Sequence, residues 1–358
     1  MIEYLVLFAV FVGLSFYTRW KGEAVSKKTL TVINLVCFSC TLILLMCRHE
    51  TMGSDLSGVE WIGYLRFFDR VASQSFKEAL FTARHFEFGF TLFVKLVSLI
   101  WWNQRFYLAV TAFVSLLPIA LMIGRKSEDP AFSWIIYTSL MPFMLLYSGL
   151  RQGTAIGLAV VAFIFAEEKR PVWFVLAAVA AFSFHVSAAL VFLLYPLTAI
   201  RIAKKWRFAT IAALPLAVVF CRFAIKVAVS KFPKYEYLLT EGGGSYRYFL
   251  MLLAVYIFCC VFTDESSFQN ACLNVFFAAC AFQMLGIFSQ TAPRAGFYFT
   301  PVLSVLYPDV IRKIENRRIA SLSYYGGVVC FTLLAFYIIY TTDWAMAYPY
   351  HWFWDKIA

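Results

Sequence analysis

Apolar stretches separated by short polar loops run along almost the whole chain. A helix needs about 20 mostly apolar residues to cross the hydrocarbon core of a bilayer. The apolar stretches occupy residues 1–18, 29–47, 88–102, 106–123, 131–148, 153–166, 171–200, 208–229, 248–262, 270–289, 296–308 and 320–340. The pattern predicts an all-α polytopic integral membrane protein, with residues 1–358 as one transmembrane domain. We expect about 11–13 transmembrane helices, including short or re-entrant ones.

Two segments between these stretches are more polar. Residues 48–87 form the longest of them, and apolar residues recur there at helical spacing, at Trp61, Ile62, Leu65, Phe68 and Ala72. This spacing predicts an amphipathic helix in an outer, periplasmic segment. The second segment, 230–247, contains three consecutive glycines and is predicted to be an outer flexible loop.

The Lys and Arg residues indicate which loops face the cytoplasm, because cytoplasmic loops carry an excess of both. Loops 19–28, 201–207 and 310–318 carry clusters of them, which places the N-terminus outside. Loops 124–130 and 166–170 carry Lys/Arg pairs beside acidic residues and are assigned to the same side by a weaker signal.

This assignment restricts two stretches. Residues 88–124 must cross an odd number of times, so the short stretch 88–102, which contains Lys95, is predicted to re-enter. Residues 171–200 must cross twice, which predicts a pair of short helices that meet near His185. A single long helix with His185 at the midplane is the alternative. Broken helices are tolerated only beside protein or a water-filled cavity, so we expect a polar cavity that opens outward.

Composition excludes other protein classes. The chain is 62% hydrophobic and only 14% charged, whereas soluble domains carry roughly 25% charged residues. An ordinary cytosolic enzyme, a disordered chain and a secreted disulfide scaffold are therefore excluded. The formal net charge of +11 is largely explained by loops, and we expect no nucleic-acid partner. All nine Cys lie in apolar stretches and are interpreted as small buried hydrophobes.

Two residues stand out as candidates for chemistry, because ionisable groups inside membranes are costly and usually functional. Arg151 lies between two apolar stretches with Gly149 and Gly153 beside it, where a tight turn could bring a ligand close. It either reaches toward lipid headgroups or grips a phosphate with both guanidinium nitrogens. His185 is the only His inside an apolar run, and is either a packing residue or a general base.

Other charged residues flank apolar stretches. Glu87 precedes one stretch, Arg294 lies at the start of another, Asp55 follows a Gly-Ser pair, and Arg247 follows the glycine run. Glu87 could equally be an interfacial charge and Asp55 a capped turn. The four His residues are scattered and none has an acidic pair at ligand spacing, so no metal motif is present. Several outward arginines without a metal motif suit a diphosphate that guanidinium groups hold alone. No cofactor is expected.

At these residues the chain resembles the EpsG/Wzy-type polysaccharide polymerases, the O-antigen polymerase family of bacterial cell envelopes. The matching residues are Arg48, Gly53-Ser54-Asp55, Tyr64, Glu87-Phe88-Gly89, Arg151-Gln152, Phe184-His185-Val186-Ser187-Ala188 and Arg294-Ala295-Gly296-Phe297-Tyr298-Phe299. Together they span most of residues 30–310. Two departures are Ser54, where Thr is usual, and a loose match over 230–247, which leaves Arg247 uncertain.

The resemblance implies a membrane glycosyltransferase with an architecture similar to that of O-antigen ligases. Such polymerases transfer a growing glycan from undecaprenyl diphosphate to the non-reducing end of a new lipid-linked unit, without a metal. The reaction takes place at the outer face of the bacterial cytoplasmic membrane. The implied partners are this lipid-linked oligosaccharide as donor and acceptor, the bilayer and a possible chain-length regulator protein.

Roles for the candidate residues follow from this chemistry. The leaving diphosphate gains charge, and preorganised donors stabilise it. Arg151 and Arg294 are the first candidates for this role, with Arg48 and Arg247 behind them. For the base that activates the acceptor hydroxyl, His185 comes first and Glu87 or Asp55 next. Gln152, Tyr64 and Tyr298 are expected to contact the substrate. We expect direct displacement with inversion.

Other functions are compatible with the same features. An O-antigen ligase would use this chemistry on a different acceptor. A flippase or transporter of lipid-linked sugars would also contain intramembrane charges and broken helices. Against a transporter, the chain has no duplicated halves and its distinctive charges gather on one predicted face. A membrane O-acetyltransferase is favoured only by His185.

Overall fold

The computed structural model describes residues 1–57, 63–82, 85–231, 236–240 and 246–356. The described residues are helical throughout, apart from loops and one isolated bridge between Arg48 and Trp352. Among these described residues, seven helices are long and apolar enough to cross a membrane, and four shorter apolar helices accompany them. The prediction of an all-α polytopic membrane protein is therefore confirmed.

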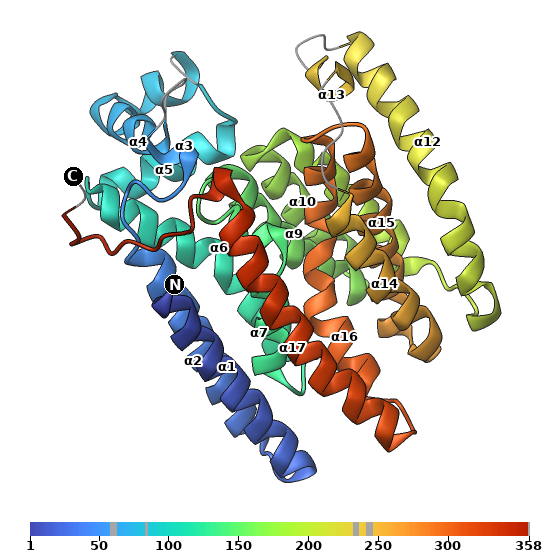
Figure 1. Cartoon of the computed structure of the whole chain (residues 1–358). Coiled ribbons are helices and arrows are strands. Elements are labelled where there is room, and N and C mark those ends of the chain that lie inside the picture. The colour runs from blue at the N-terminus through green and yellow to red at the C-terminus, as the bar shows by residue number, and fades with distance from the viewer. Residues whose placement is uncertain (58–62, 83–84, 232–235, 241–245, 357–358) are drawn as a thin grey trace.

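The elements are numbered in chain order (Figure 1). The α-helices are α1 (Ile2–Lys21), α2 (Lys27–Met46), α3 (Ser54–Ser57), α4 (Tyr64–Ser73), α5 (Phe88–Ile100), α6 (Gln104–Lys126), α7 (Pro130–Thr138), α8 (Met141–Met144), α9 (Leu150–Glu167), α10 (Pro171–Phe184), α11 (Leu194–Ala199), α12 (Arg207–Lys231), α13 (Tyr237–Thr240), α14 (Arg247–Phe262), α15 (Ser267–Met284), α16 (Leu303–Arg312) and α17 (Arg317–Thr341). The 3-10 helices that matter below are η3 (Val186–Leu193), η6 (Leu285–Ile287), η7 (Ala292–Tyr298) and η8 (Thr300–Val302), and η2 (Glu78–Thr82) is a π-helix.

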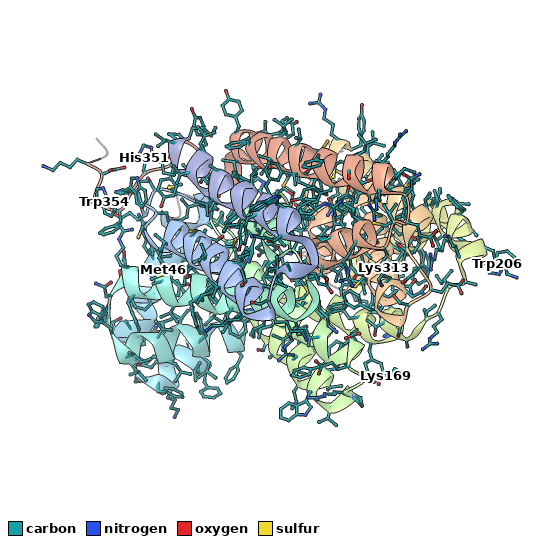
Figure 2. All side chains as sticks on the ribbon, turned by 90° about the horizontal axis from the view of Figure 1, so that it is seen from below. Met46, Lys169, Trp206, Lys313, His351 and Trp354 are labelled. Carbon is teal, nitrogen blue, oxygen red and sulfur yellow. The ribbon has the colours of Figure 1, made fainter. Side chains whose placement is uncertain are left out.

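The Lys/Arg-bearing loops 19–28, 125–129, 167–170, 201–206 and 313–316 meet at one end of the bundle, together with the acidic loop 263–266. We call this end the basic end. Ion pairs join several of these loops, such as Lys313 Nζ to Asp264 at 3.0 Å and Lys126 Nζ to Glu167 at 2.6 Å. Figure 2 shows Lys169, Trp206 and Lys313 toward one side of the molecule and His351 and Trp354 toward the other. The weak assignment of loops 124–130 and 166–170 to the same end as the others agrees with this arrangement.

The opposite end, which we call the distal end, comprises residues 48–57, 63–82 and 85–87 and the tail from 342 to 356. Helix α5 begins and ends there. The residues that follow it bond to Asp69 of α4, with Trp102 Nε1 at 3.2 Å and Gln104 Nε2 at 2.6 Å. Of the two helices between residues 88 and 126, α6 is long and apolar enough to cross a membrane, whereas α5 has only 13 residues, and the single crossing stays a prediction.

Lys95 explains how a charged residue fits inside α5. The side chain is buried, and its Nζ donates to the carbonyls of Val71, Ala72 and Gln74 at 3.1, 3.3 and 2.6 Å. These carbonyls lie at the C-terminal end of α4, where a helix has unpaired acceptors and a partial negative charge. Lys95 thus caps α4 and ties it to α5.

The chain breaks at His185, which confirms the predicted pair of short helices over a single long one. Helix α10 ends at Phe184, and His185 is extended, with φ −155° and ψ 125°. The chain then returns to the basic end through η3 and α11. Asn274 Nδ2 of α15 donates to the carbonyls of Leu197 and Ile200 and holds the end of this return.

Two other predicted spans differ from continuous helices. Stretch 131–148 divides into α7 and α8, because the chain turns at Ser139 and Leu140 before Pro142. Stretch 296–308 begins as the 3-10 turns η7 and η8, and only then becomes α16. The position of Arg151 also differs from the prediction. The sequence placed it between two apolar stretches, whereas in the structure it belongs to the first turn of α9.

The buried apolar residues form two main cores. The larger one runs through the bundle from α1 to α17. The smaller one lies among α4, α5 and the start of α6, and includes Phe67, Phe68, Phe90 and Tyr107. Phe184 packs against both. The seam between the two cores at the distal end is where the predicted polar residues meet.

Candidate active site

An ion pair between Arg151 and Glu87 crosses the seam. Arg151 Nη1 lies 2.5 Å from Glu87 Oε2, and Arg151 Nε donates to the Tyr64 hydroxyl at 3.3 Å. The guanidinium carbon lies 4.1 Å from the centre of the Phe86 ring. Both charged side chains are about one-fifth exposed, at 21% and 22%, so the pair is reachable from outside. Such a framed guanidinium is rigid and still offers donors to an anion.

A close contact between helices fixes the position of Glu87, which precedes the first residue of α5. A Cβ on Gly89 would lie 2.0 Å from Ser183 Oγ and 2.9 Å from the Ser183 carbonyl oxygen. Only glycine allows α5 to approach α10 this closely. The approach lets Glu87 Oε1 accept a hydrogen bond from the backbone amide of Val186 at 3.2 Å. The Glu-Phe-Gly sequence thus combines a charged group with the glycine that positions it.

The electrostatic state of Glu87 follows from this arrangement. Burial raises the pKa of its carboxyl group. The Arg151 guanidinium and the hydrogen bonds lower this pKa by a larger amount, so it lies below the ordinary value. Glu87 is therefore a stable carboxylate whose two oxygens are both engaged.

His185 belongs to a hydroxyl network on the other side of the seam. Its Nδ1 lies 2.7 Å from Ser187 Oγ and 3.3 Å from the Tyr298 hydroxyl, and these two oxygens are 2.8 Å apart. The Ser187 backbone amide also donates to Nδ1 at 3.3 Å. A backbone amide can only donate, so Nδ1 is an acceptor and a neutral ring carries its proton on Nε2. His185 therefore presents an N–H donor at Nε2.

Asp55 lies at a second turn that depends on glycine. Gly53 has φ +107°, and a Cβ there would lie 2.1 Å from the Tyr147 carbonyl oxygen. The Asp55 amide donates to Ser148 Oγ at 3.2 Å, just before α9 begins. Burial raises the pKa of Asp55, and nearby Ser54, Arg294 and Arg151 offset this only in part. Asp55 is the half-buried carboxylate in this region that has no ion-pair partner within the described residues.

Arg294 lies in η7, where backbone carbonyls are held by two amide side chains. Gln152 Nε2 donates to the Arg294 carbonyl at 3.1 Å, and Gln283 Nε2 donates to the Pro293 carbonyl at 2.8 Å. The Arg294 side chain faces a cavity of about 770 Å³, where its guanidinium lies 5.1 Å from the centre of the Trp344 ring. A cavity with polar lining residues therefore exists at the distal end, and its opening toward the outside stays a prediction.

Two predicted residues lie apart from the ion pair. Arg48 is buried beneath the C-terminal tail, with Nη1 on the Leu45 carbonyl at 3.2 Å and its guanidinium 5.5 Å from the Tyr147 ring centre. Arg247 is exposed on the rim of the cavity, 3.5 Å from the Tyr337 hydroxyl. The structure thus brings Glu87, Arg151, His185, Gln152, Tyr64 and Tyr298 together, with Asp55 and Arg294 beside them.

Several residues were not proposed from the sequence as site residues. Ser148 and Ser187 bond to Asp55 and His185, Phe86 packs on Arg151, and Gln283 supports η7. Ser187 was visible as part of the Phe-His-x-Ser-Ala sequence, whereas Gln283 carries no local signal. Within the described residues, no group of three His, Cys, Asp or Glu side chains is close enough to hold a metal ion.

The fold and this cluster define a class of protein: a polytopic membrane protein with clustered arginine, carboxylate and hydroxyl groups at one end of the bundle, where Arg294 also lines a cavity. The EpsG family model matches residues 33–352, nearly the whole chain, and the chain belongs to the EpsG family. This membership supports a polysaccharide polymerase-type function in polysaccharide biosynthesis. No curated protein and no solved structure matches the chain.

Proposed function

We propose that the protein polymerises lipid-linked oligosaccharide repeat units. The growing glycan is transferred from undecaprenyl diphosphate to the non-reducing end of a new lipid-linked unit. The observation that supports this most is the partly exposed Arg151–Glu87 pair beside the cavity that Arg294 faces. The guanidinium groups of Arg151 and Arg294 both act on Asp55. Two such groups suit a diphosphate leaving group, and the membrane fold suits a lipid carrier.

The proposed step is a single displacement. The acceptor hydroxyl oxygen bonds to the anomeric carbon of the sugar at the reducing end of the growing glycan. The bond from that carbon to the phosphate oxygen breaks, and its electron pair stays on the lipid diphosphate. Arg151 and Arg294 stabilise this charge, which is the type of contribution that lowers such barriers most. Attack opposite the leaving group inverts the anomeric configuration.

We propose that the Asp55 carboxylate is the base that accepts the proton of the acceptor hydroxyl. Glu87 is the weaker base, because Arg151 and the Val186 amide occupy its oxygens and its pKa is lowered. His185 is also disfavoured, because Nδ1 already accepts hydrogen bonds. The Asp55 carboxylate accepts hydrogen bonds from the neutral hydroxyls of Ser54 and Ser148 and forms no ion pair within the described residues, and burial raises its pKa. In this assignment His185 donates from Nε2 to the substrate.

The orientation in the membrane is part of the proposal. The loops of the basic end are short and carry clustered Lys and Arg, as cytoplasmic loops do. The cavity then opens toward the periplasm or cell exterior from the cytoplasmic membrane. Undecaprenyl-linked units that have been flipped to the outer leaflet would reach it there, and a chain-length regulator would bind on the same side.

The test uses purified protein in vesicles that contain lipid-linked repeat units. We expect a ladder of longer lipid-linked glycans with wild type, with or without a chelator, and no ladder with Arg151→Ala. The Asp55→Asn variant should elongate the glycans far more slowly than the His185→Gln variant. Wild-type protein that moves units across the bilayer without joining them would establish a flippase. Transfer only to a lipid-core acceptor would establish a ligase, and either result would end the polymerase proposal.

A further inference from the structure

Helix α12 carries two charged residues in an apolar setting that the proposed reaction does not use. Only 11% of the most apolar segment of this helix is buried, against 78% of the corresponding segment of α15. Most of α12 therefore faces away from the bundle (Figure 1). Arg222 and Lys226 lie four residues apart and therefore on the same side of the helix. Within the described residues, neither forms an ion pair or a hydrogen bond. Uncompensated charges at such a position are costly and point to a ligand.

The depth of these residues matches a lipid headgroup. A helix rises about 1.5 Å per residue, so Arg222 and Lys226 lie about 22 and 28 Å along α12 from Arg207 at the basic end. The hydrocarbon core is about 30 Å thick. Lys226 is therefore at the level of the distal headgroups, and Arg222 is one turn deeper. A pair of cations at this spacing suits two linked phosphates better than one.

Arg222 is also held in place and is close to the catalytic cavity. Its guanidinium lies 4.4 Å from the centre of the Phe288 ring. It lines a small cavity with Leu285, Phe288 and Ser289. Ser289 also lines the large cavity that Arg294 faces. Only the segment that contains η6 thus separates Arg222 from the Arg294 cavity.

We infer that Arg222 and Lys226 bind the diphosphate of a lipid-linked substrate at the flank of the bundle, between α12 and residues 285–292. This inference rests on the proposed function and adds a second diphosphate site to it. A polymerase that joins two lipid-linked units handles two diphosphates: one leaves, and the other stays on the acceptor. Arg151 and Arg294 serve the first, and Arg222 and Lys226 hold the second, with its sugars directed past η6 into the cavity.

The test measures binding and turnover separately. Full-length protein in nanodiscs of phosphatidylcholine is titrated with a fluorescent polyprenyl diphosphate. The double variant R222Q/K226Q should bind it at least about 10-fold more weakly, since each lost charge-assisted hydrogen bond is worth about that factor. Arg222→Lys keeps the charge and should retain most of the affinity. Lys231→Gln, which removes one charge at the end of α12, should bind as wild type does.

Two outcomes would overturn the inference. One is unchanged binding by R222Q/K226Q, with melting temperature as a check on folding. The other is equal competition by phosphatidylglycerol, which would show a general anionic-lipid surface. In the polymerisation assay the double variant should raise KM for lipid-linked units several-fold and leave kcat near wild type. If wild type binds the probe at Arg222 and Lys226 but forms no polymer, the proposed function fails and this site stands.

Discussion

The two ends of the bundle both gather charged side chains, but they arrange them differently. At the basic end, loop residues form ion pairs with one another, such as Lys313 with Asp264 and Arg312 with Glu128. Many of these side chains are about one-third to one-half exposed. At the distal end, the Arg151–Glu87 pair is enclosed by Phe86 and Tyr64 and adjoins the hydroxyl network of His185.

The two ends differ in how much charge remains available to a ligand after the side chains have paired with one another. Exposed pairs at the basic end join neighbouring loops and are worth about 0–1 kcal/mol each. At the distal end, Arg294 faces a cavity with an aromatic ring beside it, and Asp55 has no cationic partner within 4.0 Å among the described residues. Charge that folding has not fully compensated can interact with a substrate. We therefore expect substitutions at the distal end to affect activity and equivalent substitutions at the basic end to affect it little.

The largest difference should come from removing one arginine at each end. Arg151→Ala should lower the polymerisation rate about 10²–10³-fold, because it removes a donor to the leaving diphosphate. Arg312→Ala should stay within about 2-fold of wild type, since its ion pair with Glu128 is exposed. Chain elongation in vesicles measures both. Equal losses in the two variants would contradict the comparison.

Carboxylates at the two ends should differ in their effect on the pH profile. Burial raises the pKa of Asp55, whereas the pKa of Asp264 is lowered, because hydrogen bonds from Ser266 and the pairing with Lys313 outweigh its burial. A base must be deprotonated, so activity should fall as pH drops through the raised pKa of Asp55. Asp55→Asn should lose about 10²-fold and flatten this acid limb. Asp264→Asn should leave the limb unchanged, as rates from pH 4 to 8 would show.

Glycine substitutions distinguish the close contact between α5 and α10 from an ordinary position in a helix. Gly89→Ala should destabilise the protein by about 1–3 kcal/mol and displace Glu87, because the added Cβ overlaps Ser183. Activity should fall about 10-fold as a result. Gly326→Ala in α17 is the control, since nothing lies within 4 Å of its added Cβ. Thermal unfolding in detergent should place the control at or slightly above wild type.

The smallest effect should come from two buried cations that cap helices. Lys95 binds carbonyls at the end of α4. Arg207 binds the carbonyls of Thr263 and Asp264, which follow α14, and both of these hydrogen bonds are 2.5 Å long. Lys95→Met and Arg207→Met should each cost about 1–3 kcal/mol, because buried carbonyls lose their donor. Only Lys95→Met should also lower activity, by a few-fold, because α5 carries Glu87. Melting temperature and elongation rate together distinguish the two effects.

Much of the fold could be predicted from the sequence, because length and charge are local signals. The break at His185 followed from a stretch too long for one span and too short for two full ones, together with the Lys/Arg loops on both sides. The prediction that stretch 88–102 re-enters used the same argument, and the structure shows that stretch as the 13-residue helix α5. The turn before Pro142 was missed, although a proline in the first turn of a helix was a usable signal. The 3-10 start of stretch 296–308 depends on packing of Gly296 against α15, which the sequence alone does not indicate.

The site was predictable as a set of residues but not as a set of partners. Arg151, Glu87, His185 and Tyr298 were proposed from separate positions, and the structure brings them together. Arg48 shows the limit of this reasoning. It lies beneath the C-terminal tail, where His49 N bonds to the His351 carbonyl at 2.8 Å, and a contact between residues 300 positions apart leaves no local pattern. The choice among three candidate bases likewise depends on which hydrogen bonds each one makes.

The division into two cores has a consequence for how the molecule fluctuates. The smaller core of α4, α5 and the start of α6 packs as its own unit, and native proteins open locally in such units at lower free energy than global unfolding. Amide protons of α4 and α5 should therefore exchange with solvent sooner than those of α9 and α15. Each opening would part Glu87 from Arg151 and widen the seam while the bundle stays folded. The glycan of the proposed substrate would thus enter through a fluctuation of one lobe, without separation of the membrane helices.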